Sequence, residues 1–133
     1  MPSFVVDTYK VRLMLQRIGN PPTTVRTKMI EIASTPLFHG IVVRANLAFA
    51  TTWDNWSGSP VVGYYSDSNP LQPLLTGWLP SSEYSYWYDV LRAERPLTVF
   101  YNISPINGAS YVDQISLGTS TEPIGEGPED FSP

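Results

Sequence analysis

Histidine, the side chain best suited to acid–base chemistry near neutral pH, occurs once in this sequence, as His39. A serine triad would need a histidine, an acid and a nucleophilic serine, but no serine lies in a G-x-S-x-G motif. A zinc site would need several nitrogen or sulfur ligands, and the chain has no cysteine. We therefore expect His39 to be a turn residue beside Gly40, and we expect neither a metal nor a cofactor.

Two aspartates, Asp54 and Asp67, flank a short apolar segment at residues 61–65, with aromatic residues nearby. Glycoside hydrolysis needs only two carboxyl groups roughly 5–10 Å apart, so a carboxylate-dependent hydrolase is one hypothesis. Both aspartates, however, lie among Asn, Ser, Gly and Pro, where aspartate commonly supports turns. The sequence thus favours binding over catalysis, without excluding an enzyme.

A loop rich in tryptophan is the most suggestive binding motif. In Trp53-Asp54-Asn55-Trp56, two indoles enclose a carboxylate and an amide, and Trp78 lies in a later loop. Flat aromatic faces with nearby hydrogen-bonding groups suit a carbohydrate, a base or the edge of a protein. The alternative is a hairpin loop whose tryptophans cover the end of the core.

Two cations, Lys10 and Arg12, precede a loop at residues 19–23, and two more, Arg26 and Lys28, follow it. If Ile18 faces Thr24 across a hairpin, all four share one face of the sheet and could bind a small anion such as a nucleotide. A register shifted by one residue would divide them between the two faces. Alternatively, the face is solvated or neutralised by acids elsewhere.

The distribution of charge supports some anionic partner or internal pairing. Residues 1–44 carry a net charge of +4 and residues 45–133 one of −8, which gives the chain its −4. No aromatic residues lie among the hairpin cations, and the net charge is negative. We therefore do not expect binding to extended nucleic acid.

The elements that must position these residues are mostly extended. Residues 4–18 alternate between apolar and polar, which predicts a strand with one buried face at the odd positions. It forms a hairpin with residues 24–33. The remaining strands are predicted from β-branched and aromatic runs at residues 40–53, 61–65, 97–103 and 111–117. Residues 67–80, interrupted by prolines and a glycine, are expected to be a loop.

One helix is predicted near residues 82–95. Four apolar residues fall at helical spacing, Tyr84, Trp87, Tyr88 and Leu91. Ser81 is a candidate N-cap, and Pro96 ends the helix because the residue before a proline leaves the helical region. The fold class is therefore mainly β: an antiparallel sheet or β-sandwich of about five to six strands with one helix.

Residues 1–118 are expected to form one soluble globular domain, and residues 119–133 an acidic, Pro/Gly-rich mobile tail. No window of 18 apolar residues predicts a membrane span, and no signal peptide is visible, which favours a cytoplasmic location.

Aromatics make up 13% of the chain and charged residues only 15%, so some rings should remain exposed. The first hypothesis is therefore a non-enzymatic binding or assembly protein that forms homo-oligomers through an aromatic-rich surface. The alternatives are the binder of a small anionic ligand and the hydrolase.

Overall fold

The computed structural model describes residues 2–53, 62–94, 96–106 and 108–119. Within them the chain forms seven strands, one α-helix and two single 3-10 turns, at Phe38–Gly40 and Thr51–Trp53. The helix, α1, spans Glu83–Ala93. The strands are β1 (Ser3–Ile18), β2 (Thr23–Ser34), β3 (Arg44–Ala50), β4 (Gly63–Ser66), β5 (Leu74–Pro80), β6 (Leu97–Ile106) and β7 (Ala109–Thr119).

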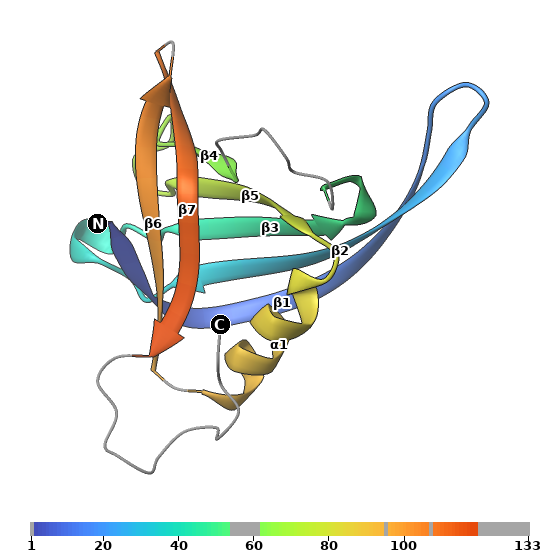
Figure 1. Ribbon diagram of the computed structural model, residues 1–133. Coiled ribbons are helices and arrows are strands. Elements are labelled where there is room, and N and C mark those ends of the chain that lie inside the picture. The colour runs from blue at the N-terminus through green and yellow to red at the C-terminus, as the bar shows by residue number, and fades with distance from the viewer. Residues whose placement is uncertain (1, 54–61, 95, 107, 120–133) are drawn as a thin grey trace.

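The strands form one sheet in the order β1-β2-β3-β5-β4-β7-β6, which closes into a barrel where Ser3–Val5 pair with Thr98–Phe100 (Figure 1). The prediction of a mainly-β fold with one helix is confirmed. The predicted alternatives were an antiparallel sheet and a β-sandwich. The single curled sheet corresponds to the first, except that β3 and β5 run parallel.

Strand β5 corrects the prediction of a loop at residues 67–80. Its buried positions alternate as in any strand, with Leu75, Gly77 and Leu79 facing inward. Pro80 is the last residue of the strand, and Gly77 lies opposite Gly63 of β4. A Cβ on Gly63 would overlap the carbonyl oxygen of Thr76, so this glycine permits the close approach of the two strands.

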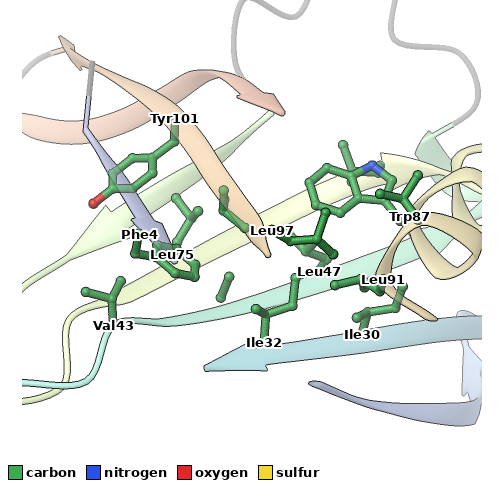
Figure 2. Packing of buried hydrophobic residues seen from close by; sticks show 14 of the residues in the cluster. Phe4, Ile30, Ile32, Val43, Leu47, Leu75, Trp87, Leu91, Leu97 and Tyr101 are labelled. Atoms are coloured by element: carbon green, nitrogen blue, oxygen red, sulfur yellow. The ribbon is translucent and has the colours of Figure 1, made fainter. Parts of the chain in front are cut away.

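The core fills the barrel and extends under α1 (Figure 2). Strand residues that alternate inward supply most of it, and the helix contributes three buried side chains. The largest fully buried side chains are Phe49, Ile30, Ile32, Leu47, Leu75, Leu91, Val99 and Val112. In Figure 2, Trp87 and Leu91 point from the helix toward Ile30 and Leu47 of the sheet.

Helix α1 agrees with its predicted apolar stripe. Trp87 and Leu91 are buried, together with Val90, and Tyr84 and Tyr88 pack half-buried against the core. The N-cap position is Ser82 rather than the predicted Ser81, and the Ser82 side chain makes no capping hydrogen bond. On the exposed side Arg92 donates to Asp89 at 3.2 Å, the pair expected from their spacing.

Strand β1 differs from the prediction of a buried odd-numbered face. Phe4 points into the core, whereas Val5 is exposed. A β-bulge between Val6 and Thr8 then reverses the parity, and Tyr9 faces inward as a partly buried residue. From Val11 to Ile18 every residue is exposed. The alternation is therefore real, but only the first half of the strand, as far as Tyr9, reaches the core.

Two tyrosines stack inside the barrel, and they predict how stability depends on alkaline pH. The rings of Tyr65 and Tyr101 lie 5.9 Å apart. Burial raises the pKa of both hydroxyls, with a further contribution from Asp67 at Tyr65 and from Tyr65 at Tyr101. The folded state therefore favours the protonated tyrosines.

We expect the melting temperature to fall as the pH rises above about 10, because the stabilisation from a raised folded-state pKa is fully present below the unfolded pKa and is lost as the pH rises through the folded pKa. Tyr101→Phe removes one ionisable group and should reduce this fall, as measured by thermal unfolding from about pH 8 to pH 11. Equal falls in the wild type and in Tyr101→Phe would show that Tyr101 is not responsible.

The predicted mobile tail and the turn cluster at residues 54–60 lie outside the described residues, apart from Thr119. That residue ends β7 opposite Leu97. No helix among the described residues is long and apolar enough to cross a membrane.

Candidate interaction surface

The distal part of the β1–β2 hairpin projects beyond the other strands (Figure 1). The pairing between β2 and β3 ends at Lys28 and Phe49, and Lys28 lies opposite Leu13 of β1. Residues 13–28 are therefore a two-stranded ribbon, which we call the arm. Except for half-buried Val25 and buried Thr27, all of its residues are exposed.

Apolar side chains are concentrated on this arm. Among the described residues ten large hydrophobic side chains are exposed, and four belong to the arm: Leu13, Met14, Leu15 and Ile18. Leu13 is 56% exposed and Leu15 60%. An exposed apolar patch of this kind usually marks an interaction surface.

The register divides the arm into two faces. Leu13 lies opposite Lys28 and Leu15 opposite Arg26, so one face combines two leucines with two cations. We call it the leucine face. The leucine face lies on the same side of the sheet as the core. Alternate residues of a strand point to one side, and buried Ile30 and Ile32 alternate with Lys28 along β2.

This register corrects the predicted anion site. Ile18 pairs with Thr23 rather than Thr24, a shift of one residue. Lys10 and Arg12 consequently lie on one face, and Arg26 and Lys28 on the other. The shift arises because the loop is one residue shorter than predicted. It ends at Pro22, and β2 begins at Thr23. The four cations do not form a common patch.

Lys10 and Arg12 instead share one acidic partner within the sheet. Glu31 of β2 lies 3.6 Å from the Lys10 ammonium and 3.2 Å from the Arg12 guanidinium. Exposed pairs of this kind contribute little to stability, roughly 0–1 kcal/mol each. By contrast, the described residues supply no acidic partner within salt-bridge distance of Arg17 or Arg26 on the arm.

Aromatic contacts fix the base of the arm to the helix. The Lys28 ammonium lies 4.8 Å from the ring centre of Tyr84, which stacks on Tyr88 and meets Phe49 edge to face. Burial raises the pKa of the Tyr84 hydroxyl, and Tyr88 and Tyr9 add to the effect. The side chain of Lys28 is therefore held in place, whereas those of the distal leucines are not covered.

The structure describes two tryptophans of the predicted tryptophan site, Trp53 and Trp78. Trp53 ends a 3-10 turn and is half-buried, and half-buried Trp78 lies on β5 with its ring 5.5 Å from that of Tyr64. Within the described part of the chain no ring contact joins these two tryptophans. Asp54, Asn55 and Trp56 lie outside the described residues, so their predicted role in binding stays a prediction.

The structure describes two of the candidate catalytic residues, His39 and Asp67. His39 occupies a 3-10 turn with a positive φ of 63°, which confirms the prediction of a turn residue. Asp67 follows β4, and its predicted partner Asp54 is not described. In the described ranges no three His, Asp or Glu side chains gather in a way that could hold a metal ion.

The arm is the feature that sequence reasoning missed. The available signal was that the apolar alternation of β1 continues to the hairpin loop, whereas the short length of β3 (Arg44–Ala50), against a predicted strand at residues 40–53, became visible only in the structure. Comparisons with protein families, curated proteins and solved structures give no match to this chain.

Proposed function

We propose that this protein is a non-enzymatic assembly protein that binds other copies of itself through the arm. The observation that carries the proposal is the exposed apolar arm, with Leu13 and Leu15 on one face and Met14 and Ile18 on the other. The proposal keeps the self-association expected from the sequence, but transfers it from the tryptophan loop to the hairpin.

The physics of an isolated hairpin supports this proposal. A two-stranded ribbon alone is only marginally stable in water, because neither face is buried. The arm nevertheless continues the regular β1–β2 ladder as far as Ile18 and Thr23. A partner that covers one face would remove apolar surface from water, worth roughly 25 cal/mol per Å² before the costs of association.

Charge favours a partner of the same kind. The arm carries Arg17, Arg26 and Lys28 and no acid, a net charge of +3. Since the whole chain has a net charge of −4, the residues outside the arm carry −7. The arm of one copy is therefore attracted to the body of another, which also speeds their encounter.

Leu13→Ser should lower the solution mass of the protein. We expect wild-type protein at micromolar concentration to sediment above the 14.8 kDa of one chain, and Leu13→Ser to shift toward that value. The matched control is Leu71→Ser, because Leu71 is 57% exposed but lies away from the arm. It should keep the wild-type mass. A wild-type mass of one chain at concentrations up to about 100 μM would refute self-association.

A further inference from the structure

A groove lies at the opposite end of β1 from the arm. It has a volume of about 450 Å³ and lies between the start of β1, the end of α1 and the start of β6. Its apolar walls include Val5, Val6 and Tyr9 of β1 together with Leu91 of the helix and Leu97 of β6. Val5 is exposed there, so the groove is open to a partner.

The described charged residues that line the groove are both acids. Asp7 lies at the β-bulge of β1, and Glu94 follows the last turn of α1. The leucine face of the arm has the complementary composition, because Leu13 and Leu15 lie beside Arg26 and Lys28. Arg17 alternates with Leu13 and Leu15 along β1, so it lies on the same face and adds a third cation. Apolar surface can thus meet apolar surface while the Asp7 carboxylate meets a cation.

The arm cannot reach the groove of its own chain. Both belong to β1, and the nine residue-to-residue steps from Val6 to Leu15 extend about 30 Å at 3.3 Å per step. Residues Thr8 to Ile18 are paired continuously with β2, so the strand cannot fold back without breaking this ladder. An arm that fills a groove must therefore come from another molecule.

We propose that the leucine face of one copy binds in the groove of the next, in a head-to-tail contact between the two ends of β1. This inference rests on the proposed function and adds the receiving surface to it. Because the two surfaces differ, copies that each donate an arm to the next one form a closed ring or an open filament, and two copies that exchange arms reciprocally form a two-fold dimer.

Mixing two variants tests this arrangement. Leu13→Ser/Leu15→Ser removes the arm contact and leaves the groove intact, whereas Val5→Lys places a charge in the groove and leaves the arm intact. We expect each variant alone to have the mass of one chain. An equimolar mixture should form a complex of two chains and no larger one, because only one functional contact remains between them. Circular dichroism should show that both variants retain the β-rich fold.

The outcomes separate this inference from the proposed function. If Val5→Lys keeps the wild-type mass while the arm variant dissociates, the arm mediates assembly but the groove does not receive it. That result would also be expected if two arms paired with each other. If the mixture stays at the mass of one chain, the head-to-tail contact is likewise wrong.

A charge exchange provides a second test that does not depend on the apolar variants. Asp7→Lys and Arg26→Glu should each weaken self-association several-fold, as measured by the dissociation constant in sedimentation. The chain that carries both substitutions should recover much of the wild-type affinity, because the opposite charges are restored across the contact. If the double variant loses as much binding free energy as the two single variants lose together, the pairing of these two surfaces is wrong.

Discussion

Trp87→Ala is expected to lower the free energy of unfolding by about 3–5 kcal/mol, the cost of truncating a large aromatic side chain in a core. Trp87 is buried on α1, and it contributes to the same core as Leu91 and Leu47. Urea denaturation monitored by circular dichroism measures this loss. The m-value, the slope of the unfolding free energy against urea concentration, should stay unchanged if the native fold is retained.

The helix itself supplies the control. Tyr86 is next to Trp87 in sequence but is 64% exposed, so Tyr86→Ala should change stability by no more than about 0.5 kcal/mol. A loss below about 1 kcal/mol for Trp87→Ala would contradict the burial of this face and would place the helix stripe against solvent or a partner.

Gly63→Ala is expected to destabilise the protein by about 3 kcal/mol, because the added methyl group meets backbone rather than a movable side chain. The Cβ would overlap the carbonyl group of Thr76, so β4 and β5 would have to separate. Thermal or urea unfolding measures the effect.

Two other glycines provide a graded comparison. A Cβ on Gly77 would lie 2.7 Å from the Cδ2 atom of Leu47, which can rotate away, so Gly77→Ala should cost less. A Cβ on Gly118 would meet Phe100 only at 4.0 Å, and Gly118→Ala should be tolerated. A different order of the three losses would show that β4 and β5 can separate at little cost.

Local patterns predicted several elements correctly. The apolar spacing of Tyr84, Trp87, Tyr88 and Leu91 indicated the helix and its buried face, and the alternation before and after residues 19–23 indicated the first hairpin. Both signals depend on residues that are near one another in sequence. They therefore require no knowledge of which strands become neighbours.

The remaining errors arose from long-range pairing. Strand β5 pairs parallel with β3, and that partner, rather than its own composition, makes residues 74–80 extended despite Pro73 and Gly77. The hairpin register depends on how the residues between Ile18 and Thr23 form the turn, which composition does not determine. The exposure of Leu13 and Leu15 follows from the short length of β3, a property of a different segment.

The closure of the barrel has a consequence for the order of events during protein synthesis. Ser3 pairs with Phe100, so the seam between β1 and β6 cannot form until about 100 residues have left the ribosome. A β-hairpin forms in about 1–10 μs, whereas translation at about 5–20 residues per second needs roughly 5–20 s to reach β6. The β1–β2 hairpin can therefore form on the nascent chain several seconds before the barrel closes, while Ile30 and Ile32, which are buried in the complete fold, still face water. Slower translation would lengthen this interval and the exposure to aggregation that accompanies it.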